Sequence, residues 1–246
     1  HKHPFYFTTE VSINLADDEE LIQLMAKAGF NQAFVGIETP DDAGLAECGK
    51  KQNQKRDLVE SVKTIQRHGL IVSGGFIVGF DSDTPSIFAR QIEFIQKSGI
   101  VTAMVGLLSA PTNTKLYRRL EEENRLLSIA SGDNMDGSLN FVPKMNYQTL
   151  VQGYKQILET IYSPKEYYER VKTLLSEYNV QQRTKLTLTD IRAFFRSIWK
   201  IGIFDKGKLY YWKLLGYCLI RCPKKFAVAV TMAIYGFHFR KVVRTV

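Results

Sequence analysis

One unit recurs through the first half of this 246-residue sequence: an amphipathic helical segment ends at a glycine, and an apolar strand-like segment follows at once. The helical segments span residues 20–28, 58–68 and 87–98, and the glycines are Gly29, Gly69 and Gly99. Glycine suits this place because the residue after a helix often takes a left-handed conformation. Strand-like segments lie at residues 5–15, 33–38, 70–78 and 100–108. This alternation predicts parallel strands in an α/β barrel or a doubly wound sheet. The units share no detailed sequence repeat, which argues against a solenoid.

Two helix starts carry capping signals. Asp17 and Glu20 have the spacing of a capping box, and Thr84 followed by Pro85 offers an N-cap and a proline at the first helical position. These signals support the predicted order of strands and helices.

The first predicted strand has one polar face. Glu10, Ser12 and Asn14 occupy alternate positions, and Val11, Ile13 and Leu15 lie between them. Parallel strands covered by helices are normally apolar on both faces. The polar face therefore predicts a lumen that contains a ligand, with a solvent-exposed edge strand as the alternative.

Two later strands carry glycines close to acids, at the sheet edge where both α/β architectures bind their ligands. In the GIE segment, Gly36 shares a face with Glu38 and removes bulk beside its carboxylate. The alternative role for Glu38 is to cap the following helix. The segment GGFIVGFDSD holds Gly74, Gly75 and Gly79. Since glycine weakens a strand, it often marks a place where a ligand or another backbone comes close.

Charge is divided unevenly along the chain. Residues 181–246 hold fourteen Lys and Arg against two acids, a balance of +12, whereas residues 1–180 hold nineteen against twenty-three, a balance of −4. From residue 147 onward the pattern is helical, at residues 147–162, 164–178, 187–200, 206–221 and 224–240. Residues 226–239 are almost wholly apolar but too short to span a bilayer, so they predict a core helix or an interfacial one. The two parts are expected to meet different partners.

The cysteine content limits the class of protein. With 45% hydrophobic residues and three cysteines, Cys48, Cys218 and Cys222, the chain fits a globular protein and not a disulfide scaffold. No secretory leader is recognisable, so a reducing cytoplasm is expected. The sequence begins at His1 without a methionine, from which we expect a piece of a longer protein.

An ordered set of segments resembles a known family. The segments are TEVSINLADDEELIQLMAKAGFNQAFVGIETP, KKQN, GGFIVGFDSDTPSIF, AMVGLLSAP, TKLYRRL and GDNMDGSLNFVPKM. They resemble the later barrel strands of the cobalamin-binding radical S-adenosylmethionine (SAM) enzymes, in the branch that includes the hopanoid C-2 methylases and carries an extra helical domain after the barrel. The similarity covers about residues 4–143 and continues more weakly through ILETIYSPKEYYERV.

The resemblance implies a fold and a set of cofactors. It implies a partial radical SAM (β/α) barrel of parallel strands followed by an all-α domain, with SAM and a [4Fe-4S] cluster at the barrel top and cobalamin on an upstream domain. In this family three cysteines spaced C-x3-C-x2-C hold the cluster. The sequence lacks that triplet: Cys218 and Cys222 have only the first spacing and are interpreted as ordinary helix residues, and Cys48 as a packing residue. We therefore expect the cluster ligands, the first barrel strands and the cobalamin domain upstream of His1, and no catalysis by this chain alone.

The resemblance also implies which residues bind SAM. Glu10, Ser12 and Asn14 match a strand that directs polar groups toward SAM. Glu38, with Gly36 beside it, matches the family's GIE segment near the ribose or methionine part of SAM. A carboxylate there can hold a ribose diol or an ammonium group.

Further implied contacts surround the adenine. Gly75, Ile77 and Gly79 match the strand near the adenine, where the glycines admit the cofactor and Ile77 forms an apolar wall. Gly106 keeps the last strand open to the adenine. The resemblance assigns no catalytic side chain and no metal ligand to this chain.

Three segments are predicted: residues 1–128 as the later strands and helices of the barrel, residues 129–146 as a loop over the barrel mouth, and residues 147–246 as a basic, aromatic-rich helical domain. Asn134 and Asn140 in the loop are candidate contacts for substrate or for positioning the loop. A plain linker is the alternative.

Three function classes compete. The first is the C-terminal portion of a cobalamin-dependent radical SAM methyltransferase that acts on an apolar or lipid-like substrate. The second is a radical SAM enzyme that catalyses another reaction, such as cyclisation or rearrangement. The third is a basic nucleic-acid-binding module, which the apolar run at residues 226–239 disfavours. Expected partners are a small apolar substrate, an electron donor protein and an anionic membrane surface that the basic, aromatic tail would contact. The expected localisation is cytoplasmic, with or without membrane association.

Overall fold

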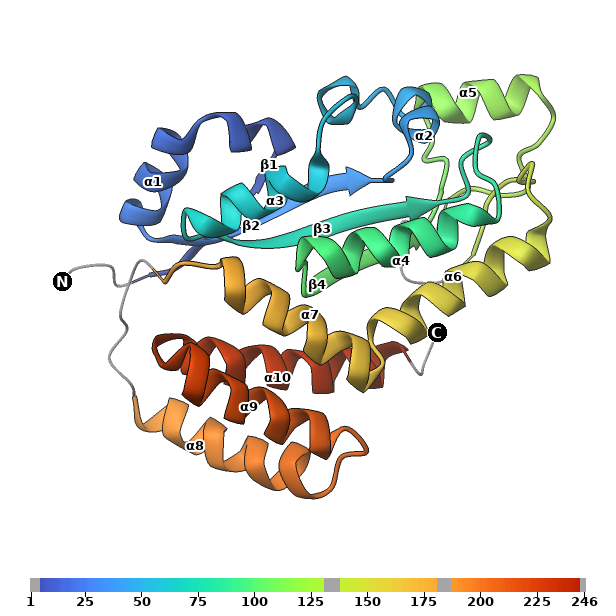
Figure 1. The fold of residues 1–246 in the computed structure, drawn as a ribbon. Helices are drawn as coiled ribbons and strands as arrows, with labels where there is room; N and C mark the ends of the chain where they lie inside the picture. The colour runs from blue at the N-terminus through green and yellow to red at the C-terminus, as the bar shows by residue number, and fades with distance from the viewer. Residues whose placement is uncertain (1–4, 131–137, 181–186, 244–246) are drawn as a thin grey trace.

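Four parallel strands form a single sheet in the order β1-β2-β3-β4. The computed structural model describes residues 5–130, 138–180 and 187–243, and Figure 1 shows the fold. The strands are β1 (Phe7–Val11), β2 (Phe30–Glu38), β3 (Ile71–Val78) and β4 (Thr102–Leu107). The predicted arrangement of parallel strands and helices, followed by a helical region, is confirmed.

Helices connect each strand to the next. The 3-10 helix η1 (Ile13–Asp17) and α1 (Glu19–Ala28) follow β1; α2 (Asp42–Glu47), the 3-10 helix η2 (Lys51–Asn53) and α3 (Leu58–Arg67) follow β2; α4 (Ser86–Ser98) follows β3; and α5 (Lys115–Glu122) follows β4. Gly29, Gly69 and Gly99 have φ angles of 107°, 98° and 72°. The glycine that follows each of α1, α3 and α4 is therefore left-handed, as predicted.

The two faces of the sheet differ in burial. One face is covered by helices, and its residues are fully or almost fully buried: Ala33, Val35, Ile37, Val72, Phe76, Val78, Ala103, Val105 and Leu107. The residues between them on β2, β3 and β4 are mostly half-buried, and Met104 on β4 is exposed. We call this second side of the sheet the open face.

The start of the chain departs from the predicted strand. β1 ends at Val11, and Ser12 is the residue before η1, so Asn14 lies in a 3-10 turn and not on a strand. The alternation of apolar and polar residues in the sequence extends past the end of β1, because Ile13 and Leu15 are buried although they lie in the 3-10 turn. Ser12 and Asn14 therefore do not extend the polar face of β1.

Both predicted N-caps are wrong. The cap of α1 is Asp18, whose carboxylate accepts a hydrogen bond from the Leu21 N–H at 2.9 Å. The preceding Asp17 instead forms an ion pair with Arg56. The hydroxyl of Thr84 bonds to the hydroxyl of Ser86 at 2.8 Å and caps no backbone group of α4.

The region after residue 146 is helical, close to the predicted ranges. Its helices are α6 (Tyr147–Ile161), α7 (Pro164–Glu177), α8 (Leu188–Ser197), the π-helix η3 (Ile198–Ile203), α9 (Lys208–Arg221), the 3-10 helix η4 (Pro223–Lys225) and α10 (Phe226–Val242). In Figure 1, α6 and α7 lie along α4, and α8 lies at the far side of the bundle from the sheet.

The helical region shares its core with the sheet. The hydroxyl of Tyr162 donates to the carbonyl of Ala103 on β4 at 2.8 Å. Arg170 of α7 is fully buried, 5.3 Å from the ring centre of Tyr167, and donates to the carbonyl of Val101. The buried apolar side chains of both regions form one cluster. The boundary at residue 147 stays a prediction.

The apolar helix α10 is a core helix. Its Ala229, Val230, Met232 and Ala233 are buried, and Gly236 lies against the ring of Tyr167. Of the two alternatives drawn from the sequence, the core helix is confirmed. In the described part of the chain, no helix combines the length and the apolar character needed to cross a membrane.

Candidate functional site

The open face collects most of the predicted cofactor residues. Strand register places Gly36 beside Gly75 and Ile77 beside Gly106. Glu10 of β1 pairs with Phe34, one row earlier on β2. The register therefore places these residues in successive rows along the open face, toward the carboxyl ends of β2 and β3. In Figure 1 the arrows of β2 and β3 end near α2 and α5.

Glu38 closes β2 in an unusual conformation. It has a φ of 67°, and its Oε1 lies 2.8 Å from Nζ of Lys50, with 15% of its side chain exposed. A Cβ atom at Gly36 would lie 2.6 Å from the same oxygen, so the prediction that Gly36 makes room for this carboxylate is confirmed. The alternative role as a helix cap is wrong, because Asp41 caps α2.

Two buried amides hold the strand ends. Nδ2 of Asn53 donates to the carbonyls of Gly36 and Ile37, each at 3.1 Å. Nε2 of Gln91 donates to the carbonyls of Glu38 and Ile77, each at 3.3 Å. The register of β2 and β3 shifts between Gly36 and Glu38, so these amides supply hydrogen bonds at the irregular end of the ladder. They fix the backbone from which Glu38 projects.

The glycines of β3 have different surroundings. A Cβ at Gly75 would lie 3.0 Å from the ring of Phe34, so the open face carries an aromatic ring there. Gly79 follows the strand with a φ of 108°, and a Cβ would lie 3.2 Å from Leu150. The positive φ alone explains why a glycine occupies position 79, and the side chain of Leu150 fills the space beside it. Contact of either glycine with a cofactor stays a prediction.

Asp83 stabilises the loop after β3. Its Oδ2 accepts the N–H groups of Gly79 and Phe80 at 2.8 and 3.0 Å. Burial raises the pKa of Asp83 to about 6, against the lowering effect of these two hydrogen bonds, and the nearby acids Asp41 and Glu47 raise it further.

Asp81, two residues earlier, is surrounded by cations. Arg125 donates to both of its oxygens, at 2.9 and 2.7 Å, and the hydrogen bond with Arg125 holds the pKa of Asp81 below its usual range. Arg119 lies 3.2 Å from Asp81 and 3.1 Å from Glu47 of α2. This charge network ties α2, the β3 loop and the segment after α5 together at the carboxyl edge of the sheet.

Asn140 positions the chain after β4. It is buried, exchanges two hydrogen bonds of 2.9 Å with the backbone of Ala110, and donates to the carbonyl of Ser128. Of the two roles expected for it, the structure shows positioning. Asn134 lies outside the described residues.

The cysteines do not form a cluster site. Cys218 and Cys222 lie at the end of α9, with sulfur atoms 3.3 Å apart, and Cys48 lies at the end of α2. Across residues 5–130, 138–180 and 187–243, no group of three His, Cys, Asp or Glu residues could hold a metal ion. These residues do not fit an iron–sulfur cluster. Cys48 is exposed, so its interpretation as a packing residue is wrong; it sits where α2 ends and its thiol donates to the Leu45 carbonyl.

The open face fits part of SAM better than it fits a metal. Gly36 and Gly75 lie side by side, and the side chains of other residues occupy the space above them: the ring of Phe34 over Gly75, and Glu38 with Lys50 over Gly36. Ile77 adds an apolar side chain to the same face. Such a set can contact a flat base on one side and accept hydrogen bonds from a diol or an ammonium group on the other. Glu38 would be the residue that holds the polar part.

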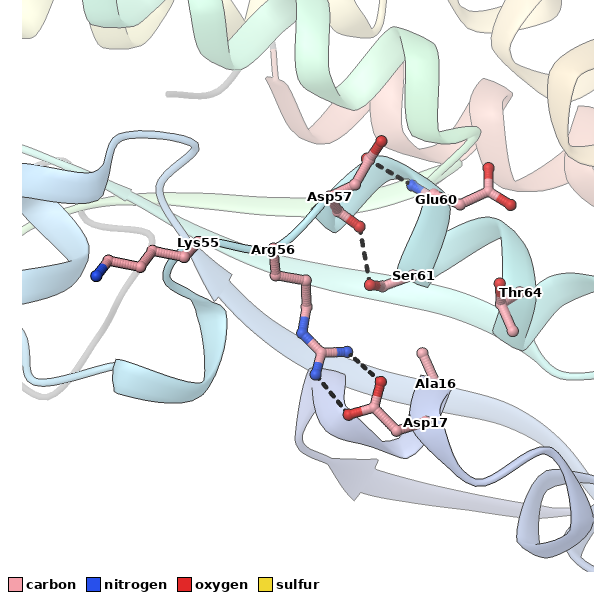
Figure 2. A pocket seen from close by; sticks show the side chains of 8 residues that line it. All are labelled: Ala16, Asp17, Lys55, Arg56, Asp57, Glu60, Ser61 and Thr64. Carbon is pink, nitrogen blue, oxygen red and sulfur yellow. Dashed lines mark hydrogen bonds and ion pairs between the residues drawn. The ribbon is translucent and has the colours of Figure 1, made fainter.

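A separate surface pocket lies away from this face. Figure 2 shows it between η1 and α3, with Arg56 and Asp17 paired across one side. Its other lining residues are Ala16, Lys55, Asp57, Glu60, Ser61 and Thr64. None of the candidate cofactor residues contributes to it.

Sequence reasoning missed the residues that support Glu38. Lys50 and Asn53 belong to the KKQN segment, which indicates the family but no role for either residue. Gln91 lies on the buried side of an otherwise ordinary helix. A polar residue at a buried helix position was the available signal for Gln91. Nothing in the local pattern indicates which carbonyls these amides reach.

Comparison with known proteins identifies the family of this chain. Residues 2–95 match the radical SAM superfamily, and residues 114–246, more than half of the chain, match a domain of unknown function, DUF4070. An uncharacterized methyltransferase of Synechocystis sp. is 33% identical over 252 residues, covering 99% of this chain and 47% of that protein.

Two further relatives also have methyl-transfer names. The hopanoid C-2 methylase of Rhodopseudomonas palustris is 32% identical over 221 residues, covering 86% of this chain and 41% of that protein. The bacteriochlorophyllide d C-12(1)-methyltransferase of Chlorobaculum tepidum is 23% identical over 119 residues, covering 48% of this chain and 26% of that protein. The chain thus spans less than half the length of each of these relatives.

Proposed function

This chain belongs to the radical SAM enzymes that carry a DUF4070 domain, and from that premise we propose that it is the C-terminal portion of a cobalamin-dependent methyltransferase. One observation carries the proposal: 99% of the chain aligns with a protein named as a methyltransferase, and 86% aligns with a hopanoid methylase. The aligned part includes the helical region as well as the sheet.

The sheet supports this proposal through its edge. Within the described residues, the outer side of β1 pairs with no other strand, and the preceding Phe5 and Tyr6 are 67% and 50% exposed. An unpaired edge strand is a place where further strands can add. In the whole protein, these would be the earlier strands of the barrel, together with the three cysteines that this chain lacks.

The open face would contribute the contacts to SAM. Glu38 would hold the ribose or the methionine part, with Glu10 further along the face, and Ile77 and Gly106 would lie at the adenine. When bound in the whole protein, SAM and cobalamin would supply the methyl group and the radical chemistry. The residues of this chain would bind and orient the cofactor.

The substrate and partners follow from the relatives' chemistry. We propose a small, apolar or lipid-like substrate, because a hopanoid methylase is among the similar proteins. Reduction of the cluster would require an electron donor protein. Three free cysteines fit a reducing compartment, which we propose is the cytoplasm. We also propose that the protein meets such a substrate at an anionic membrane.

The test uses the full-length protein reconstituted with iron, sulfide and cobalamin. With a chemical reductant and SAM labelled in its methyl group, we expect 5′-deoxyadenosine to form and label to appear in a lipid extract of the producing organism. Formation of 5′-deoxyadenosine without label transfer would favour cyclisation or rearrangement. Absence of SAM cleavage by protein with an intact cluster would overturn the enzyme assignment.

A further inference from the structure

A stripe of exposed apolar side chains runs along α8 and η3. Its members are each between 45% and 86% exposed: Leu188, Ile191, Phe195, Trp199, Ile203 and Phe204. The first five are spaced three or four residues apart, which places them on one side of the helix, and Phe204 follows directly after η3. The opposite side holds α8 in the bundle, where Phe194 packs on Phe226 of α10 and Ser197 bonds to Tyr211 of α9. The stripe therefore faces outward.

A row of cations accompanies this stripe. Arg192, Arg196 and Lys200 follow directly after Ile191, Phe195 and Trp199. In α8, each arginine therefore lies about 100° around the helix from its apolar neighbour, and Lys200 lies next to Trp199 in η3. All three are exposed, and none forms an ion pair within the described residues. We call the six apolar residues and these three cations the α8 face.

The nearby acids are engaged elsewhere. The carboxylate of Asp190 accepts the N–H and hydroxyl of Thr187 at 2.8 and 2.7 Å, which closes the capping box of α8. Asp205 forms an ion pair of 2.8 Å with the buried Arg240. Neither acid forms an ion pair with a cation of the α8 face in the part of the chain that the structure describes.

Aromatic rings gather at the end of the stripe. The rings of Trp199 and Phe204 meet edge to face with centroids 5.1 Å apart. The indole N–H of Trp212 on α9 donates to the Gly202 carbonyl at 3.0 Å, so this half-exposed ring borders the same turn. Tryptophan rings with one polar and one apolar side favour the interface between lipid headgroups and acyl chains.

From these observations we propose that the α8 face docks on an anionic lipid surface. Apolar residues on one stripe would enter the boundary of the acyl chains, while the adjacent cations meet acidic headgroups. A protein partner fits this pattern less well, because cations at every turn beside the apolar stripe require a surface that is negative along the whole length of the helix.

This inference deepens the proposed function, because it states how the enzyme would reach a lipid-like substrate. The purpose of docking rests on the proposed function, whereas the docking itself rests on the residues of the α8 face. In Figure 1, α8 lies far from α2 and α5, which border the carboxyl edge of the sheet. The α8 face would therefore hold the protein at the membrane without forming part of the cofactor site.

The test is co-sedimentation of the full-length protein with vesicles of phosphatidylcholine alone or mixed with phosphatidylglycerol. We expect binding to the anionic vesicles at low salt, and weaker binding at high salt. The double variant Arg192→Glu/Arg196→Glu should bind about thirtyfold more weakly or worse, and Phe195→Ser/Trp199→Ser should also lose binding. Because the side chains are exposed, the circular dichroism spectra of these variants should remain that of the folded protein.

Matched controls lie on the sheet region. Lys115→Glu/Arg118→Glu reverses two exposed cations of α5, and Leu21→Ser/Leu24→Ser removes two exposed leucines of α1; both should bind as wild type. Equal binding by the α8 variants and wild type would overturn the inference, as would failure of the wild type to bind anionic vesicles. No SAM or cluster is needed, so this result is independent of the methyltransferase assay.

Discussion

Nζ of Lys50 lies 2.8 Å from Oε1 of Glu38, and a side chain at Gly36 would begin within 2.9 Å of both atoms. The pair sits at the end of β2, on the backbone that Asn53 and Gln91 hold in place. Because Glu38 is partly exposed and Lys50 more so, a ligand's hydroxyl or ammonium groups can share the carboxylate with the lysine.

Glu38→Gln should weaken SAM binding or SAM cleavage by the full-length protein about tenfold, because a charged acceptor becomes a neutral one. The absorbance of the cluster should not change. Equilibrium binding of SAM and the rate of 5′-deoxyadenosine formation measure the effect. The control is Glu60→Gln, which changes an exposed glutamate paired with Arg67 on α3. Cleavage at the wild-type rate by the Glu38 variant would make this residue purely structural.

Gly36→Ala should weaken SAM binding to a similar degree while costing less than about 1 kcal/mol of stability. The new Cβ would lie 2.6 Å from Oε1 of Glu38 and 2.9 Å from Nζ of Lys50. Both atoms are at the ends of flexible side chains, so the two side chains can move away from the new methyl group, but they cannot keep their present positions. Gly216→Ala is the matched control, since no atom lies within 4 Å of its Cβ position in α9. It should raise the melting temperature slightly and leave SAM binding unchanged. A Gly36 variant that is folded and binds SAM normally would contradict the role of this pair.

Asp83→Asn should change how stability depends on pH. Burial raises the pKa of Asp83 from 3.8 to about 6. A raised carboxyl pKa stabilises the fold at pH values below the unfolded pKa, and this contribution is lost as pH rises through the folded pKa. Asparagine does not titrate, so the stability of the variant relative to wild type should improve by up to about 3 kcal/mol between about pH 4 and pH 7. Thermal unfolding of the full-length apoproteins at these pH values measures the difference, and an unchanged difference would contradict a buried, titrating Asp83.

Asp81→Asn and Asp17→Asn form a matched pair, because each aspartate receives two hydrogen bonds from one arginine. The side chain of Asp81 is 8% exposed and that of Asp17 is 59% exposed. Asp81→Asn should lower the free energy of unfolding by about 2 kcal/mol or more, and Asp17→Asn should lower it by less than about 1 kcal/mol. The pKa of Asp81 is lowered from 3.8 in the folded protein. The ionised carboxylate therefore stabilises the fold above pH 3.8, and this stabilisation is lost as the pH falls below that value. Unfolding of both variants at neutral pH gives the comparison, and equal losses would contradict it.

Local sequence was sufficient where the cause is local. Gly29, Gly69 and Gly99 follow their helices with positive φ, because any residue with a side chain would be strained there. The predicted helices after residue 146 agree with α6 to α10 because each has its own period of apolar residues. The glycine and glutamate at the end of β2 were paired correctly, since both lie on one face of the same strand.

The sequence by itself thus determined the order of strands and helices, the parallel sheet and, through ordered motifs, the family. Tertiary structure alone decided that Lys50, Asn53 and Gln91 meet the end of β2, because these contacts join segments far apart in the chain. It also decided that the apolar helix α10 is core and the α8 face is exposed. Periodicity shows that a helix has an apolar side, but burial of that side depends on which other elements pack against it.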